Sequence, residues 1–274
     1  MTDNNNYQQL TRTFQRLSRF SHLAAIAGWD MFAMMPPGGS RARGEAMAEL
    51  GVLQHQILTD KKVGEWLENA RQEDLNDLEQ ANLREMTRQY QQAALLPESL
   101  VEAKSLAGSR CEHAWRSQRP ANDWHGFAEN LREVVKLSRE EAQIRADAKG
   151  CSRYDALLDI FEPDMTSARL DVLFADLKSW LPSLLANVVD KQAQKTLLEP
   201  QGPFAITDQR ELGLEAMRVL GFDFDGGRLD ISAHPFCGGV PEDVRITTRY
   251  NENDLLSALF GVIHETGHAR YEQN

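Results

Sequence analysis

The sequence predicts a mainly α-helical protein with a small β region near its carboxyl end. Two changes of hydrophobic period carry this prediction. Apolar residues recur at steps of three and four from Tyr7 to about Leu220, which is typical of helices. After Gly221 they alternate in short runs, which is typical of strands. A last apolar run from Asn253 then leads into a motif at 264–268 with the spacing of a metal-binding helix.

The helical region begins with a segment at 7–32. A strong helix stop follows it, with the sequence Met34-Met35-Pro36-Pro37-Gly38-Gly39-Ser40. Ser40 can cap the next helix, because its hydroxyl can accept a hydrogen bond from a free backbone N–H. The remaining helices are expected at 42–55, 60–72, 75–94, 98–117, 123–148, 167–189 and 208–220. Prolines and glycines separate them, and the sequence has no internal repeat.

Two alternating stretches, 228–232 and 243–250, predict two strands. The segment between them, His234-Pro235-Phe236-Cys237-Gly238-Gly239-Val240-Pro241, is predicted to be a turn. A small sheet beside an active-site helix can line a peptide cleft, because an edge strand can pair with an extended substrate. A hairpin that only stabilises a helical protein is the alternative.

The composition narrows the possible binding partners and the cellular compartment of the protein. The chain has 274 residues and a net charge of −11, which argues against a nucleic-acid or anionic-membrane surface. Three widely spaced cysteines predict free thiols and a reducing compartment. The start of the chain is polar, and no run of about 18 apolar residues predicts a membrane span. We therefore expect a cytoplasmic protein with one domain over 1–274, divided into a helical region (1–220), a β region (221–250) and a metal helix (251–274).

The motif at the end of the chain is His264-Glu265-Thr266-Gly267-His268. Residues four apart on a helix project from one face, about 6 Å apart along the axis, so the two imidazoles can converge on one metal ion. The ion lowers the pKa of a bound water, and the glutamate between the ligands can take the proton as the water attacks a carbonyl. The motif makes a zinc peptidase the leading hypothesis. A core helix with two solvated histidines is the alternative.

A catalytic zinc normally has three protein ligands, and the third is not evident here. The metzincin pattern needs Gly where Tyr271 stands and His where Asn274 stands, so that pattern is excluded. Glu272 continues the spacing of four, but on a straight helix it lies about 12 Å from His264, too far to share one ion. The third ligand is therefore missing or upstream, and an incomplete catalytic domain is the simplest account.

Several motifs occur in a fixed order along the chain. Those near the metal helix are His234-Pro235-Phe236, Asp243-x-Arg245-x-Thr247-Thr248-Arg249-Tyr250 and His264-Glu265-x-x-His268. Upstream are Trp29-Asp30, Met35-Pro36-Pro37-Gly38-Gly39-Ser40 with Arg43, and Tyr154-Asp155-x-Leu157-Leu158-Asp159-x-x-Glu162-Pro163. With these motifs the chain resembles the carboxypeptidase Taq family of metallocarboxypeptidases. The resemblance covers essentially the whole chain, but only about the first half of a family-length protein.

The resemblance implies a helical, cleft-containing gluzincin fold, a homodimer, and removal of C-terminal amino acids from peptides. It implies that His264 and His268 bind Zn²⁺, with Co²⁺ or Mn²⁺ as alternatives, and that Glu265 is the general base. It places three further residues in the cleft: His234, Arg245 and Tyr250. His234 would donate a hydrogen bond to substrate or to the developing oxyanion. Arg245 would either orient its strand through Asp243 or face the cleft.

The family's downstream His-Glu-Ser segment, whose glutamate is the third ligand, has no counterpart here. Its later arginine motif has none either, so this chain alone is expected to bind zinc weakly and to show little activity. Two other functions stay open. One is a catalytically silent helical fragment that dimerises or binds a partner, and the other is a zinc oligopeptidase or endopeptidase. Outside the motifs, Trp29 is predicted to anchor the core and Cys237 to pack as a neutral thiol.

Overall fold

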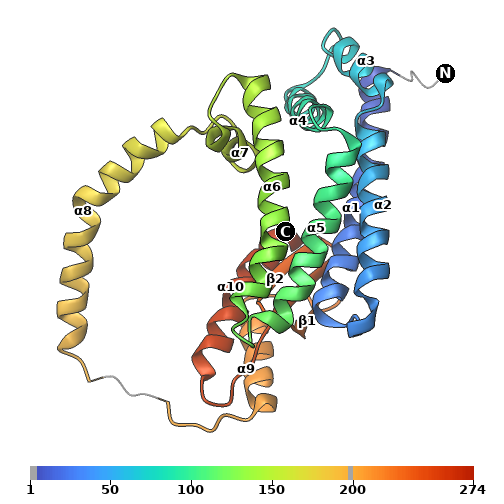
Figure 1. Ribbon diagram of the computed structural model, residues 1–274. Coiled ribbons are helices and arrows are strands. Elements are labelled where there is room, and N and C mark those ends of the chain that lie inside the picture. The colour runs from blue at the N-terminus through green and yellow to red at the C-terminus, as the bar shows by residue number, and fades with distance from the viewer. Residues whose placement is uncertain (1–4, 197–199) are drawn as a thin grey trace. The chain divides into compact units, whose positions relative to one another are not determined.

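The computed structural model describes residues 5–196 and 200–274, and it is mostly helical with one small sheet (Figure 1). The prediction of a mainly α fold is confirmed. The helices are α1 (Asn6–Ala33), the 3₁₀ turn η1 (Pro37–Gly39), α2 (Ser40–Leu58), α3 (Lys61–Ala70), α4 (Asp77–Ala94), α5 (Glu98–Gln118), α6 (Trp124–Lys149), α7 (Arg153–Phe161), α8 (Ser167–Ala193), α9 (Ile206–Val219) and α10 (Leu255–Gln273). The strands are β1 (Gly227–Ile231), β2 (Phe236–Val240) and β3 (Asp243–Thr248).

The chain divides into two compact units, which are described separately. The first unit combines Met1–Val135 with Gln201–Asn274, and the second is Lys136–Pro200. The first unit contains the sheet and the histidine motif. The expected single domain over 1–274 stays a prediction.

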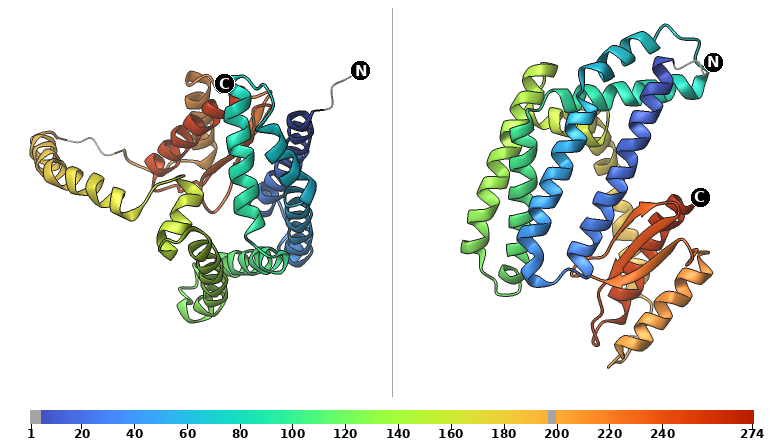
Figure 2. Two further views of the ribbon diagram at one scale, coloured as in Figure 1. Left: turned by 90° about the horizontal axis from the view of Figure 1, so that it is seen from above. Right: turned by 90° about the vertical axis from the view of Figure 1, so that its right-hand side faces the viewer.

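The helices of the first unit begin and end where local chemistry favours it. The Asn5 side chain accepts a hydrogen bond from Gln8 N at the start of α1, and Asn76 and Glu79 form a reciprocal capping box at the start of α4. Helices α1 and α2 run side by side (Figure 2). The amino end of α1 packs on α3 and α4 through one buried apolar cluster, formed by Tyr7, Leu10, Val63, Leu67, Ala70, Leu75 and Leu83.

The sheet has the strand order β1-β3-β2, with β1 parallel and β2 antiparallel to β3. The prediction of a turn over 234–241 is therefore partly wrong, because this segment contains strand β2. Two glycines in five residues hid this strand, since glycine has low strand propensity. Gly239 is required by the tight return to β3. Its φ is +134°, and a Cβ there would lie 2.1 Å from the carbonyl oxygen of Asp243.

The two faces of the sheet have opposite chemistry, because side chains alternate along a strand. One face is apolar and packs on α9 and α10 through a buried cluster of Met217, Phe222, Leu229, Val244, Ile246, Val262 and Ala269. The other face carries Arg228 and Asp230 on β1 and Arg245 on β3, and it meets α1. The sheet thus lies between α1 and the helix that carries the histidine motif (Figure 2).

The second unit contains α7, α8 and the end of α6. Lys149 forms an ion pair with Asp159, and the same carboxylate accepts a hydrogen bond from Asp164 N at 3.1 Å. Helix α7 was not among the predicted helices, because at nine residues it is too short to show a clear period. Helix α8 has no buried residue. By length and composition alone this helix could cross a membrane, whereas no membrane span was expected from the sequence.

Candidate metal centre

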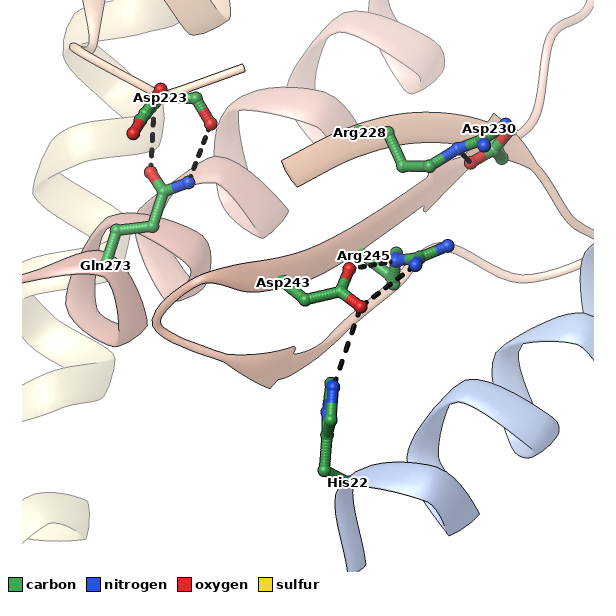
Figure 3. A network of polar contacts seen from close by, with 7 residues as sticks. All are labelled: His22, Asp223, Arg228, Asp230, Asp243, Arg245 and Gln273. Atoms are coloured by element: carbon green, nitrogen blue, oxygen red, sulfur yellow. Dashed lines mark hydrogen bonds and ion pairs between the residues drawn. The ribbon is translucent and has the colours of Figure 1, made fainter. Parts of the chain in front are cut away.

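Helix α10 is held at both ends. The Asp254 side chain accepts a hydrogen bond from Ser257 N at 3.0 Å, as a helix cap should. Near the carboxyl end, the Gln273 amide accepts from Asp223 N at 3.0 Å and donates to Asp223 O at 2.8 Å (Figure 3). Between these ends, Val262 and Thr266 are fully buried on the side that faces the sheet. The helix therefore presents a fixed face to its surroundings.

His264 and His268 converge on the exposed side of α10. Their Nε2 atoms are 3.3 Å apart, and their ring planes are inclined by 80°. Two nitrogens that each lie about 2.0–2.1 Å from a tetrahedral zinc ion are about 3.3–3.4 Å apart. The pair therefore has the nitrogen separation that two ligands of one Zn²⁺ ion have.

Glu265 lies between the two histidines in the sequence and turns toward the interior. Its exposed fraction is 8%. In the described part of the chain, no hydrogen bond or ion pair occupies its carboxylate. The oxygens of this carboxylate are therefore open to accept a hydrogen bond from a water molecule.

The third ligand is not evident among the described residues. Within residues 5–196 and 200–274, no group of three or more His, Cys, Asp or Glu side chains is placed to hold one metal ion. Cys237 is close enough for the charge of Glu265 to act on its thiol. Burial, followed by the charges of Glu265 and Glu272, raises the pKa of Cys237 to about 11. The thiol is therefore neutral near pH 7 and packs against the apolar cluster.

The segment 234–236 lies beside α10. The ring of Pro235 approaches Gly261 so closely that a Cβ on that glycine would lie 3.6 Å from Pro235 Cγ. Gly261 lies one turn before His264 on the same helical face. The His234 ring stacks on Trp115 of α5, with 4.7 Å between ring centroids. The structure thus places Pro235 against the metal helix and the His234 ring against α5, and the role of His234 as a cleft residue stays a prediction.

Arg245 points into a polar network on the sheet (Figure 3). Its guanidinium donates to both oxygens of Asp243, at 2.5 and 3.0 Å, and stacks over the Trp29 ring at 4.5 Å. His22 Nε2 lies 3.7 Å from the same carboxylate, and Arg228 lies over the same indole at 5.3 Å. Of the two roles considered for Arg245, this geometry supports the one that orients the strand.

The hydrogen bonds from Arg245 lower the pKa of Asp243, and the positive charges nearby add to the effect. A lowered carboxyl pKa contributes stability that is present above its unfolded value of about 4 and is lost as the pH falls through the folded-state pKa. The same network offsets a repulsion between like charges in the sheet. Arg228 and Arg245 are direct cross-strand neighbours, which is unfavourable for like charges unless each is neutralised. Asp230 and Asp243 supply that neutralisation.

Tyr250 follows β3 and is partly buried. Burial raises the pKa of its phenol, and the charged groups that act on it, Arg210 and Glu211, belong to α9. In the part of the chain that the structure describes, no hydrogen bond, ion pair or ring contact joins Tyr250 to His264 or His268. Sequence reasoning also missed Trp115, because nothing in the pattern of α5 indicates which distant ring it would meet.

Comparisons with known proteins agree with the motifs. The model of the carboxypeptidase Taq (M32) metallopeptidase family matches residues 9–274. Thermostable carboxypeptidase 1 of Thermus thermophilus is 37% identical over all of this chain and 56% of its own length. Carboxypeptidase 1 of Bacillus subtilis is 33% identical over 95% of this chain and 52% of its own length. The chain therefore spans about half the length of the curated relatives it matches.

Solved structures give the same result. The structure of Trypanosoma cruzi metallocarboxypeptidase 1 is 48% identical and superposes with a TM-score of 0.85 over 98% of this chain and 55% of that one. The M32 carboxypeptidase of Deinococcus radiodurans is 30% identical, with a TM-score of 0.78 over 98% of this chain and 54% of that one. A family match over nearly the whole length, together with a shared fold at this identity, leads to one conclusion: the chain belongs to the carboxypeptidase Taq (M32) family of metallopeptidases.

Proposed function

We propose that the protein is a metal-dependent carboxypeptidase that removes amino acids from the C-terminus of peptides. The observation that carries this proposal is the pair of histidine nitrogens, 3.3 Å apart, beside an unpaired and shielded glutamate. Zn²⁺ fits this pair by distance and by ligand type, and Co²⁺ and Mn²⁺ are alternatives. The names of the relatives support the choice of a C-terminal exopeptidase over an endopeptidase.

The residues of this chain have distinct tasks in the proposed reaction. A bound zinc ion would polarise the scissile carbonyl and lower the pKa of a water molecule. Glu265 takes the proton from the attacking water and delivers it to the leaving amine. His234 donates a hydrogen bond to an oxygen of the peptide. Strand β3 holds the segment that carries His234 through the Thr247 hydroxyl, and it does not take part in the chemistry.

We also propose that the protein acts as a cytoplasmic homodimer on peptides and binds neither nucleic acid nor membrane. The net charge of −11 disfavours anionic partners. The three cysteines are free, which suits a reducing compartment. The homodimer rests on the family resemblance alone, and the apparent molar mass in solution tests it.

The decisive variant is Glu265→Gln in the protein that carries these residues. The substitution keeps the shape of the side chain and removes the base, so turnover should fall by about 10²–10⁴-fold while the metal content stays unchanged. The matched control is Glu272→Gln, which alters an exposed carboxylate on the same helix and should leave turnover unchanged. The assay is mass spectrometry of the products of a defined peptide, with metal content measured on the same samples.

Three results would contradict the proposal. Normal turnover of fully metallated Glu265→Gln would exclude the assigned base. Loss of turnover in both variants alike would point to a general effect of charge on this helix. Cleavage at internal bonds, with no release of single C-terminal residues, would favour the endopeptidase hypothesis.

A further inference from the structure

The His234 side chain is placed by a stacking contact. Its ring lies 4.7 Å from the ring of Trp115, with the two planes inclined by 30°. His234 is otherwise exposed, and no hydrogen bond to its ring nitrogens occurs in the described part of the chain. Histidines that must be oriented are often held through one ring N–H, which then cannot serve a ligand. Here both nitrogens stay available.

The backbone around His234 is fixed independently of this stack. Thr247, which is fully buried on β3, donates its hydroxyl to the carbonyl oxygen of His234 at 3.1 Å and accepts a hydrogen bond from Phe236 N at 3.1 Å. The Phe236 ring meets Phe32 of α1 edge to face at 5.6 Å. The position of the His234 Cα is therefore determined by β3 and α1, and only the side-chain torsions depend on Trp115.

Trp115 is itself held in place by its neighbour in the sequence. Arg116 donates a hydrogen bond to the carbonyl oxygen of Met31 at 2.6 Å, and its guanidinium lies over the Phe32 ring at 5.0 Å. A double hydrogen bond to Glu112, at 3.0 and 3.1 Å, fixes the other side of the guanidinium. These contacts tie α5 to the end of α1, so the indole is presented from a rigid support.

We propose that Trp115 is a positioning residue that orients the His234 imidazole toward the bound peptide and leaves both of its nitrogens free for hydrogen bonding. The indole face restricts the imidazole to rotamers in which the two rings overlap. The ligand group that suits this arrangement is a carbonyl or carboxylate oxygen of the peptide, because neutral imidazole offers one N–H donor. This inference rests on the proposed function for the role of His234, whereas the stack itself does not depend on it.

The first experiment tests the stack without any assay of activity. Carbon-edited NMR of the histidine ring protons, with His234 assigned by its loss in His234→Gln, should show the Cε1 proton of His234 shifted upfield by the indole. The shift should disappear in Trp115→Leu and persist in Trp115→Phe. The control is Trp124→Leu, which removes an exposed indole near the start of α6 and should not move the signal. A His234 signal that is the same in Trp115→Leu as in the wild type would overturn the inference.

The second experiment tests the route by which Trp115 acts. In the peptidase assay, Trp115→Leu should lower kcat/KM by about three- to tenfold, the range expected from one lost aromatic contact, and Trp115→Phe should recover most of the loss. In a His234→Ala background, Trp115→Leu should add no further loss, because residues that act through one group are not additive. An equal loss in both backgrounds would overturn the inference.

The two experiments separate the inference from the proposed function. An upfield His234 signal in a protein that releases no C-terminal residues would contradict the proposed function and leave the stack established. A normal melting temperature of Trp115→Leu shows that any loss of kcat/KM does not come from unfolding. If that variant does not fold, Trp115→Met, which removes the aromatic face with a more flexible side chain, is compared with Trp115→Phe, which keeps it.

Discussion

Trp29 should be a main anchor between α1 and the sheet, and replacing it by leucine should lower the free energy of unfolding by about 1.5–3 kcal/mol. The indole is 8% exposed and takes two guanidinium groups, Arg245 at 4.5 Å and Arg228 at 5.3 Å. Cation–π contacts contribute about 0.5–1 kcal/mol each where the cation is partly solvated, so the two together contribute about 1–2 kcal/mol. Leucine also buries roughly 60–80 Å² less apolar surface, which costs about 1.5–2 kcal/mol at 25 cal/mol per Å².

One contribution has the opposite sign. The Trp29 Nε1 atom is buried and meets no hydrogen-bond partner in the described part of the chain, so removing it should recover about 1 kcal/mol. Urea unfolding followed by far-ultraviolet circular dichroism measures the net change. Trp29→Phe is the matched control, because it keeps an aromatic face and removes the unpartnered N–H, and it should lose less than about 1 kcal/mol. If Trp29→Leu unfolds at the wild-type urea concentration, or if phenylalanine is as harmful as leucine, the cation–π argument is refuted.

Two further predictions concern the surroundings of the metal helix. Gly261→Ala should leave stability unchanged or raise it by up to about 1 kcal/mol, because its Cβ would lie 3.6 Å from Pro235 and alanine favours a helix. Gly261→Leu should displace Pro235 and lower both the melting temperature and turnover. Among the thiols, the exposed Cys151 should react with a disulfide reagent at once at pH 8, whereas Cys237, with a pKa of about 11, should react at least about 100-fold more slowly. Equal rates would show that Cys237 is neither shielded nor neutral.

The features of the fold that can be predicted from the sequence are those that depend on neighbouring residues in the sequence. Helices α1 and α5 were located to within about one residue, because each has several turns of regular apolar spacing. The convergence of His264 and His268 was also predictable, since it follows from helix geometry alone. These features depend on residues that are close in the sequence.

The features that escaped prediction depend on partners that are distant in the sequence. Strand β2 exists because Gly239 allows a tight return and β3 offers hydrogen bonds, and neither fact appears in its own pattern. The role of Arg245 was open until the structure placed Trp29 against it, more than 200 positions away. Likewise, the contact of Trp115 with His234 joins segments whose separate patterns contain no sign of each other. Period and propensity describe a segment and do not name its neighbours.

Polar and apolar side chains alternate along β3, so two separate attachments depend on the alignment of this one strand. Val244 and Ile246 support the metal helix from one side, while Arg245 and Thr247 hold α1 and the His234 segment from the other. A shift of β3 by one residue relative to its neighbours would exchange these faces. A guanidinium would then enter the apolar cluster, and both attachments would be lost together. Natural variation should therefore be tolerated far more readily on α8, which has no buried residue, than in the six residues of β3. In β3 each side chain must suit its own face of the sheet, and the strand must keep its alignment for both faces.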